Sequence, residues 1–241
     1  DAVAELLGRR PDAVLGLATG SSPIPVYDEL ARRHARGELS FTGVRAFCLD
    51  EYVGLPQDHP EAYRSVIRRV FADRVGLLDV RAPDGAAEDL VAACAEYEAA
   101  IEAAGGIDLQ LLGIGSDGHV GFNEPGSSLG SRTRLKTLTA KTRADNARFF
   151  DSVDAVPRHV LTQGVATILD ARHVILVATG EAKAAPVAAA IEGPLTAMVP
   201  ASALQLHRHA SVVVDEAAAG GLRLAAYYRE TYAGKPSWQH L

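Results

Sequence analysis

Short apolar runs alternate with longer amphipathic segments along most of the chain. Five runs rich in Val, Ile and Leu stand out, at residues 14–18, 44–49, 107–114, 173–178 and 211–214. Helix-length segments with a periodicity near 3.6 residues lie between them. Nearly continuous apolar strands separated by helices are typical of a parallel sheet that is covered on both faces. The pattern predicts an α/β fold: a three-layer, Rossmann-like, open and mostly parallel sheet with helices on both faces.

The boundaries of the predicted helices carry ordinary start and stop signals. Pro23 and Pro25 open one helical segment, and Gly105 and Gly106 end another. The stretch 139–161 is different, because it holds only a short helical pattern set between breakers. We therefore predict one domain over residues 1–241, with a lid at about 139–161 that folds over one edge of the sheet.

Composition excludes several classes of protein. The chain has 241 residues, of which 48% are hydrophobic and 22% charged, and its net charge is −6 without a basic block. Nucleic-acid binding is therefore not expected. No apolar run approaches the length of about 18 residues that a membrane span needs. Cys48 and Cys94 lie in apolar segments without CxxC spacing, which predicts a cytoplasmic protein. Residues 1–10 read as the interior of a helix, so we expect a short N-terminal piece to precede them.

Polar residues and glycines follow directly after each predicted strand. The exits read TGSSP at 19–23, DEY at 50–52, GSDGHVGFNEP at 115–125, TGEAK at 179–183 and DE at 215–216. The carboxyl ends of parallel strands share one edge of a sheet, and ligands bind at that edge. These exits are thus expected to meet at one rim although they lie far apart in sequence.

Two of the exits favour an anion. Gly20, Ser21 and Ser22 offer backbone N–H groups and hydroxyls just before a predicted helix. The alternative is that Ser21 or Ser22 is an ordinary N-cap. Lys183 falls in the first turn of the helix after 173–178, where a cation is unfavourable against the helix dipole unless an anion sits in front of it. Together the two exits predict a site for a phosphorylated small molecule.

Two other exits favour acid–base chemistry. Asp117, His119 and Glu124 lie within eight residues, and an imidazole held between two carboxylates is prepared to move a proton. The alternative makes Asp117 a turn residue and His119 a core side chain. Asp50 and Glu51 directly follow a strand, where one of them is often a helix cap. If Asp50 exits at the same edge as His119, it adds a second proton-transfer group.

A metal site has little support in the sequence. His207 and His209 lie far from the acidic exits, no HExxH motif or cysteine cluster occurs, and hard-cation sites need more carboxylates. We predict a site without metal or cofactor, and a packing role for residues 207–209.

Six segments carry a family resemblance: LATGSSPIPVYDEL, FCLDEYVGL, GIGSDGHVGFNEPGSSLGSRTRLKTL, ARFF, LTQGVATILDARHVILVATGEAKA and ALQLH. With them the chain resembles the glucosamine-6-phosphate deaminases, within the glucosamine/galactosamine-6-phosphate isomerase family, along nearly its whole length. The combination of DEYVGL with DGHxxFNEP is highly specific. The related 6-phosphogluconolactonases have a GDER-like exit and a DGHxASLFP-like loop, whereas this chain has LDEY at 49–52 and FNEP at 122–125. The resemblance implies a sugar-phosphate isomerase-like fold.

The resemblance also implies catalytic roles for the matched residues. His119, oriented by Asp117 and Glu124, opens the pyranose ring of glucosamine 6-phosphate. Asp50 then moves a proton from C2 to C1, water adds at C2, and ammonia leaves with fructose 6-phosphate. No cofactor is needed, because the opened sugar supplies its own carbonyl. The substrate phosphate is held by Gly20, Ser21, Ser22, Arg148 and Lys183.

Some members of this family are hexamers that N-acetylglucosamine 6-phosphate activates at a subunit boundary. The resemblance places the effector site at Ser127, Arg134 and Lys136, and it implies a homo-oligomer. The family's C-terminal tyrosine aligns with Arg229, one residue after Tyr228.

Two alternative functions remain open at this point. One is a sugar-lactone phosphate hydrolase of the 6-phosphogluconolactonase type on the same fold. The other is a sugar-phosphate sensor that binds without turnover.

Overall fold

The five apolar runs form neighbouring parallel strands, as predicted. The structure is a computed structural model and describes residues 1–56, 58–236 and 239. The predicted strands are β1 (Val14–Leu17), β2 (Arg45–Cys48), β5 (Leu109–Leu112), β8 (His173–Ala178) and β9 (Ala210–Val214). A sixth strand, β4 (Asp79–Arg81), completes the order β4-β2-β1-β5-β8-β9, with every neighbouring pair parallel. β4 escaped the sequence analysis because it has three residues, two of them charged.

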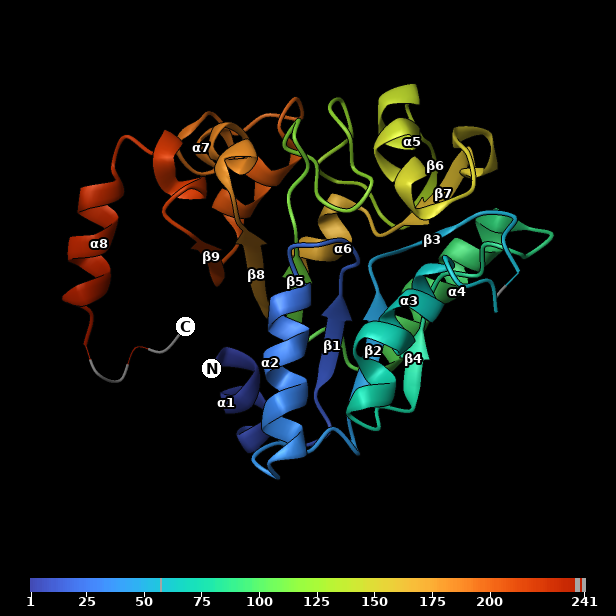
Figure 1. Cartoon of the computed structure of the whole chain (residues 1–241), viewed down its shortest axis with the longest axis horizontal. Coiled ribbons are helices and arrows are strands. Elements are labelled where there is room, and N and C mark those ends of the chain that lie inside the picture. The colour runs from blue at the N-terminus through green and yellow to red at the C-terminus, as the bar shows by residue number, and fades with distance from the viewer. Residues whose placement is uncertain (57, 237–238, 240–241) are drawn as a thin grey trace.

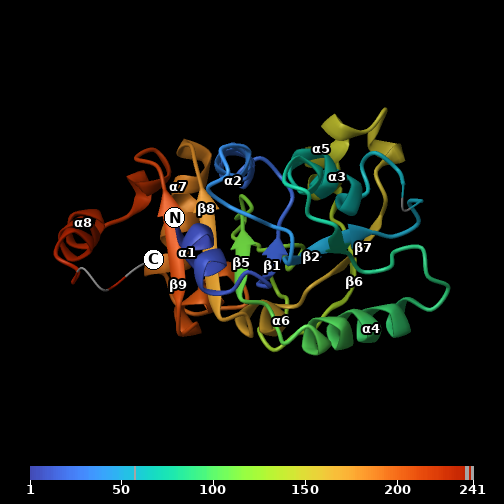
Figure 2. The ribbon, with the colours of Figure 1, turned by 90° about the horizontal axis from the view of Figure 1, so that it is seen from below.

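Helices cover both faces of this sheet (Figures 1 and 2). One face packs against α1 (Ala2–Arg9), α2 (Ile24–Ala35) and α3 (Tyr63–Val70), and the other against α4 (Leu90–Ala103), α6 (Val165–Leu169) and α7 (Ala184–Glu192). Along β1, Leu15 and Leu17 join the first apolar cluster and Val14 joins the second, as the period of two along a strand requires. The three-layer α/β prediction is confirmed.

The remaining helical elements are short or peripheral. The 3₁₀ turns are η1 (Ala72–Arg74), η2 (Ala147–Phe149), η3 (Val153–Ala155), η4 (Glu181–Lys183), η5 (Pro200–Leu206) and η6 (Ala218–Gly221). The last helix, α8 (Ala225–Ala233), has no buried residue and stands apart from the sheet (Figure 1). None of the described helices is long and apolar enough to cross a lipid bilayer.

A second, smaller sheet lies beside the carboxyl edge of the first. It is antiparallel, with the order β3 (Asp50–Tyr52), β7 (His159–Thr162), β6 (Arg134–Thr137). The sequence analysis took residues 50–52 as a loop, but they form a strand. The chain is still paired with the large sheet at Leu49, whose N–H donates to the Leu17 carbonyl at 2.8 Å, and Asp50 is already paired with Thr162 of β7. Asp50 therefore lies at the junction of the two sheets.

The stretch predicted to form a lid lies over the small sheet. It contains α5 (Ala140–Asn146), η2 and η3, and the Thr139 hydroxyl caps α5 by accepting from the Thr142 N–H. The predicted end at residue 161 is wrong, because residues 159–161 belong to β7, where Val160 and Leu161 are completely buried. A lid on this scaffold ends at about residue 158, since a buried, doubly paired strand cannot swing with it.

Candidate active site

One cavity at the carboxyl edge of the large sheet gathers most of the predicted site residues. Its volume is about 450 Å³. Seven of the predicted residues line it: Gly20, Ser21, Ser22, Asp50, His119, Arg148 and Lys183. They come from five separate chain segments: four follow strands that end at the same edge of the large sheet, and the fifth is η2, which carries Arg148.

Asp50 presents a buried carboxylate to this cavity. The residue is 5% exposed, and within the described part of the chain no hydrogen bond ends on its side chain. Burial, and secondly the charge of Glu51, raise the pKa of Asp50 well above its usual value. A carboxylate with raised proton affinity in a cavity is suited to take a proton from carbon.

His119 and Asp117 form a hydrogen-bonded pair at the same rim. His119 Nδ1 lies 2.6 Å from Asp117 Oδ1, and that oxygen also accepts from the His119 backbone N–H at 3.2 Å. Because an ionised carboxylate only accepts, Nδ1 carries the proton of the neutral ring and Nε2 keeps a lone pair. The two side chains are 24% and 39% exposed, so the imidazole remains in reach of ligand and solvent.

Gly115 makes room for this imidazole. A Cβ atom on Gly115 would lie 2.1 Å from His119 Cε1, far inside van der Waals contact. The Gly115 N–H also donates to the His119 carbonyl at 2.9 Å. The glycine is therefore required by close approach of the ring, since any side chain would displace it.

Glu124 does not contact His119 in this structure, which corrects the prediction of an imidazole held between two carboxylates. Glu124 Oε1 accepts from the hydroxyl of Thr142 at 2.5 Å and from that of Thr139 at 3.3 Å. Both threonines lie at the start of α5. Glu124 thus joins the loop that carries His119 to the first turn of α5, and Asp117 is the one described side chain that hydrogen-bonds to the imidazole.

The loop before α2 is open to an anion. α2 begins at Ile24 behind Pro23 and has no side-chain cap, so neither Ser21 nor Ser22 caps it. Among the described residues, no group accepts from the backbone N–H of Gly20, Ser21 or Ser22. Gly20 has a φ of 100°, which an L-residue with a side chain rarely adopts. The loop leaves unused donors in the wall of the cavity.

The TGEAK loop differs from the TGSSP loop that it resembles in sequence. The Gly180 N–H already donates to both oxygens of Asp215, at 3.1 and 3.0 Å. Lys183 lies just before α7, and its Nζ donates to the Ile114 carbonyl at 2.6 Å. Burial, and next the charge of Arg148, lower the pKa of Lys183. An anion beside both cations relieves that repulsion.

The sequence analysis missed several residues around the cavity. Tyr63 of α3 lines it, with its ring centroid 4.5 Å from that of Tyr52. In the lid, Asn146 Nδ2 donates to the Tyr52 hydroxyl at 3.1 Å, and Lys141 Nζ donates to Ser116 Oγ at 2.7 Å. The sequence signal that could have revealed the residues of α5 is the spacing of its polar positions 141, 145 and 146, which lie at i, i+4 and i+5 on one face of the helix.

The residues matched to the effector site meet away from the cavity. Lys136 Nζ lies 3.4 Å from Ser127 Oγ, and Arg134 precedes Lys136 by two residues on β6. Residues two apart on a strand share a face. Arg229, which aligns with the family's tyrosine, lies in α8 and forms an ion pair with Glu216.

The other candidate ligands occupy structural positions. The rings of His173 and His209 stack with centroids 3.6 Å apart, and His207 Nε2 lies 2.7 Å from the Ala171 carbonyl, which is the packing role expected for residues 207–209. Across residues 1–56, 58–236 and 239, no three His, Cys, Asp or Glu side chains are arranged to hold a metal ion. Cys48 and Cys94 are buried free thiols.

The family model for glucosamine-6-phosphate isomerases/6-phosphogluconolactonase matches residues 1–214. The chain belongs to this family. Within it, the glucosamine-6-phosphate deaminase of Pseudarthrobacter chlorophenolicus is 65% identical, over 99% of this chain and 93% of that protein. The deaminase of Streptomyces avermitilis is 61% identical, again over 99% and 93%. The resemblance inferred from the motifs is confirmed.

Solved structures of the family separate its two branches. A structure described as a monomeric glucosamine-6-phosphate deaminase is 42% identical, with a TM-score of 0.88 over 91% of this chain and 92% of that one. The 6-phosphogluconolactonase from Trypanosoma cruzi is 22% identical, with a TM-score of 0.73 over 92% and 90%. The second likeness is one of fold.

Proposed function

We propose that this chain is a glucosamine-6-phosphate deaminase, which converts glucosamine 6-phosphate and water into fructose 6-phosphate and ammonia. The observation that carries the proposal is that one cavity is lined by Asp50 and His119 and also by Arg148 and Lys183. Relatives that bear this name are 61–65% identical to nearly the whole chain. The lactonase alternative is supported only by fold.

Ring opening is assigned to His119. Its Nε2 lone pair takes the proton of the anomeric hydroxyl, and the imidazolium then gives that proton to the ring oxygen, which breaks the bond between C1 and that oxygen and leaves a C1 aldehyde. Asp117 keeps the ring oriented through the 2.6 Å hydrogen bond and stabilises the imidazolium that forms. Glu124 does not act on the substrate in this scheme. It holds the loop that carries His119 against the start of α5 through its hydrogen bond with Thr142.

Isomerisation and deamination are assigned to Asp50. Its carboxylate takes the proton from C2, which the adjacent C1 carbonyl acidifies, and the electron pair moves to give an enol at C1. Asp50 returns the proton to C1, and the C2 amine releases a proton to solvent in place of the one that the enol oxygen took up, which leaves a C1 hydroxyl and a C2 imine. Water adds to that carbon and ammonia departs, so that C2 becomes the ketone of fructose 6-phosphate. A positioned acid or base of this kind contributes on the order of 10²- to 10⁴-fold in rate. The opened sugar supplies the carbonyl, so the scheme uses no metal or cofactor.

Phosphate binding is assigned to five other residues that line the cavity. The N–H groups of Gly20, Ser21 and Ser22, which no described group accepts from, supply donors, and the Arg148 guanidinium and the Lys183 ammonium add positive charge. Arg148 lies in η2 of the lid, and Lys141 of α5 already reaches Ser116. A bound phosphate therefore draws residues 139–158 toward the cavity. We propose that residues 1–241 form one catalytic domain. We also propose that the protein acts in the cytoplasm.

A second location is assigned to regulation. We propose that Ser127, Arg134 and Lys136 bind N-acetylglucosamine 6-phosphate and that the chain forms a homo-oligomer. Two observations support the effector site: Lys136 Nζ lies 3.4 Å from Ser127 Oγ, and Arg134 and Lys136 lie on the same strand, β6. Sedimentation velocity and initial rates, with and without the effector, test both parts. A lower KM and a larger species are expected with the effector, and an unchanged monomer with unchanged kinetics would exclude both.

The decisive experiment measures ammonia release from glucosamine 6-phosphate, with a metal chelator present. Stoichiometric ammonia and fructose 6-phosphate are expected. Unphosphorylated glucosamine is the matched control, since it lacks the group that Arg148 and Lys183 bind. The absence of ammonia at high enzyme concentration would overturn the proposal. Acid release from 6-phosphogluconolactone would favour the lactonase, and binding of both sugars without turnover would favour a sensor.

A further inference from the structure

Glu51 is a buried carboxylate that the reaction scheme does not use. It directly follows Asp50 on β3 and is 8% exposed. Burying an ionisable side chain is costly unless its hydrogen bonds are satisfied. The hydrogen bonds of the Glu51 carboxylate therefore indicate its role.

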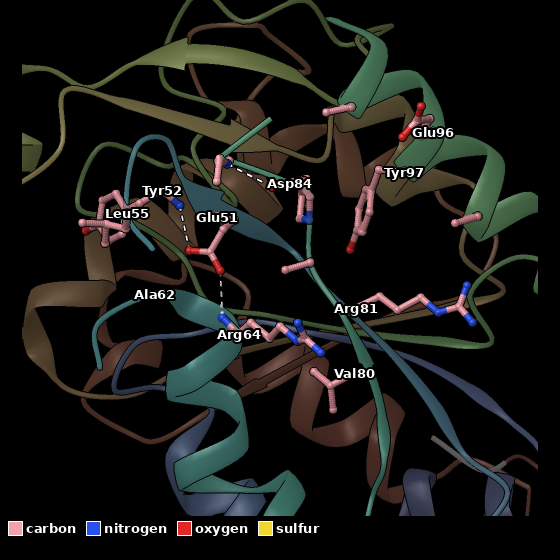
Figure 3. A pocket seen from close by; sticks show the side chains of 16 residues that line it. Glu51, Tyr52, Leu55, Ala62, Arg64, Val80, Arg81, Asp84, Glu96 and Tyr97 are labelled. Atoms are coloured by element: carbon pink, nitrogen blue, oxygen red, sulfur yellow. Dashed lines mark hydrogen bonds between the residues drawn. The ribbon is translucent and has the colours of Figure 1, made fainter. Parts of the chain in front are cut away.

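Three backbone N–H groups donate to the Glu51 carboxylate. Oε1 accepts from Tyr52 at 2.9 Å and from Tyr63 at 2.8 Å, while Oε2 accepts from Arg64 at 3.0 Å. Figure 3 shows the carboxylate between the backbone of Tyr52 and the start of α3. The N-cap residue of α3, Ala62, offers no side-chain acceptor. Glu51 thus caps α3 from outside and ties its first turn to β3.

Glu51 and Asp50 face different cavities. Asp50 lines the candidate active site, whereas Glu51 lines a separate cavity of about 300 Å³ bounded by β4, α4 and the start of α3 (Figure 3). Successive side chains of a strand point to opposite sides. Glu51 consequently cannot touch a sugar in the active site and acts only through its neighbours.

Those neighbours form part of the active-site wall. Tyr63 lines the catalytic cavity, and its backbone N–H is held by Glu51. The Tyr63 ring packs on Tyr52 and, with a centroid distance of 6.0 Å, on Phe122 in the loop after His119. The same carboxylate therefore fixes the strand that carries Asp50 and the aromatic wall beside it.

The charge of Glu51 also bears on Asp50. Burial is the main cause that raises the pKa of Asp50, and the Glu51 charge is the next. Burial raises the pKa of Glu51 itself, against the three N–H donors and the Arg64 charge, which lower it. The titratable groups facing this pair are Cys48 of β2, Tyr52 of β3, Tyr63 and Arg64 of α3, and Tyr97 of α4.

We propose that Glu51 is the positioning residue for Asp50: by pinning α3 to β3 and placing a negative charge next to Asp50, it holds that carboxylate in the orientation and state that take the proton from C2. The inference rests on the proposed deaminase function. It assigns to Glu51 a role in the proton-transfer step and none in phosphate binding, because Arg148 and Lys183 line the active-site cavity and Glu51 lines the other one.

Two substitutions separate the position of Glu51 from its charge. Glu51→Gln keeps the shape but removes the charge and sets an amide N–H against the Arg64 N–H. Glu51→Asp keeps the charge, but its side chain is too short to reach α3. We expect kcat to fall by about 10- to 100-fold in both variants, with KM changed less than about twofold. The acid limb of the kcat/KM profile should move to lower pH by about half to one unit in Glu51→Gln only.

Glu96→Gln is the matched control, since Glu96 lines the same second cavity from α4 but is exposed. It should retain wild-type kcat and pH profile. Rates are expressed per folded molecule from thermal melts, and solvent exchange of the C2 hydrogen should fall in step with kcat. If Glu51→Gln does not fold, kcat and C2 exchange of Glu51→Asp decide the matter.

Wild-type kcat in the folded Glu51 variants would overturn the inference. A loss in which the acid limb of Glu51→Gln stays in place and C2 exchange persists would also overturn it, by assigning Glu51 to fold stability. These results differ from failure of the proposed function, in which the wild-type protein itself releases no ammonia.

Discussion

Two buried aspartates at opposite ends of the large sheet show how one side chain is used for two purposes. Asp50, at the carboxyl edge, is 5% exposed and receives no hydrogen bond from the described residues. Asp108, at the amino edge, is 3% exposed and accepts from the Val14 N–H at 2.8 Å, from Arg10 and from Arg172 at 3.0 Å. A buried charge with such partners stabilises the fold, whereas one without them is costly and chemically active. We therefore expect the carboxyl edge to serve the reaction and the amino edge to serve the stability of the fold.

The largest effect is expected from Asp50→Asn. The amide cannot take the proton from C2, so kcat should fall by about 10²- to 10⁴-fold and solvent exchange at C2 should stop. The stability of the fold should be unchanged or greater, because an unsatisfied buried carboxylate is removed. Ammonia assays and denaturant unfolding measure the two quantities. A marked loss of stability with retained exchange would reverse the assignment of the two aspartates.

Gly115→Ala tests the carboxyl edge without altering any titratable group. The new Cβ would displace the imidazole of His119, and a displacement of about 1 Å costs on the order of 10²-fold in rate. Gly130→Ala is the control, since its Cβ would meet only Ser128 Oγ at 3.8 Å. Steady-state kinetics of both variants make the comparison. Equal rates would mean that His119 needs no fixed position.

Asp108→Asn should act on stability alone. It leaves Arg10 and Arg172 without their carboxylate, and because both guanidiniums are partly exposed the loss is about 2–3 kcal/mol. Turnover per folded molecule should stay at the wild-type value. Urea unfolding and ammonia release measure this, and a selective loss of kcat would show that the amino edge takes part in the reaction.

The pH dependence should also differ between the two edges. The pKa of Asp50 is raised, so kcat/KM should fall on the acid side with a midpoint well above the usual range of an aspartate. Protonating Asp50 removes an unfavourable buried charge, so its titration does not weaken the fold as the pH falls. Measuring kcat/KM across the acid range, for the wild type and for Asp117→Asn as a comparison, locates the pH at which kcat/KM falls. A midpoint near the ordinary aspartate value would contradict burial of a free Asp50.

The smallest effect is expected at His173, on the amino edge. Burial, and next the charge of His209, lower its pKa to about 4. The unfolded chain takes up this proton near pH 6.5 and the folded chain only near pH 4, so stability is lost as the pH falls through that interval. His173→Gln should reduce this acid-side loss by about 1–2 kcal/mol, discounted for partial exposure. Unfolding free energies at several pH values test it, and an unchanged slope would contradict it.

Sequence reasoning succeeded where burial leaves a pattern in the residues themselves. The runs at 14–18 and 173–178 read as strands because both of their faces are covered, so every side chain is apolar. It failed at β6, where RLKT alternates between half-buried and exposed positions, and at β3, where the three residues DEY are short and mostly polar although all are buried. Residues 159–161 were read as part of the stretch before them, since β7 could not be distinguished without its partners.

The motifs also determined which chemistry the chain carries, because residue type and spacing are local properties. The tertiary structure decided which groups act on one another: that no described group donates to Asp50, that Asp117 holds His119, that Glu124 reaches Thr142 and that Glu51 reaches α3. It also decided that Asp215 occupies the Gly180 N–H while the loop at 20–22 stays open. Such choices depend on distances between segments far apart in the chain, and only packing sets those distances.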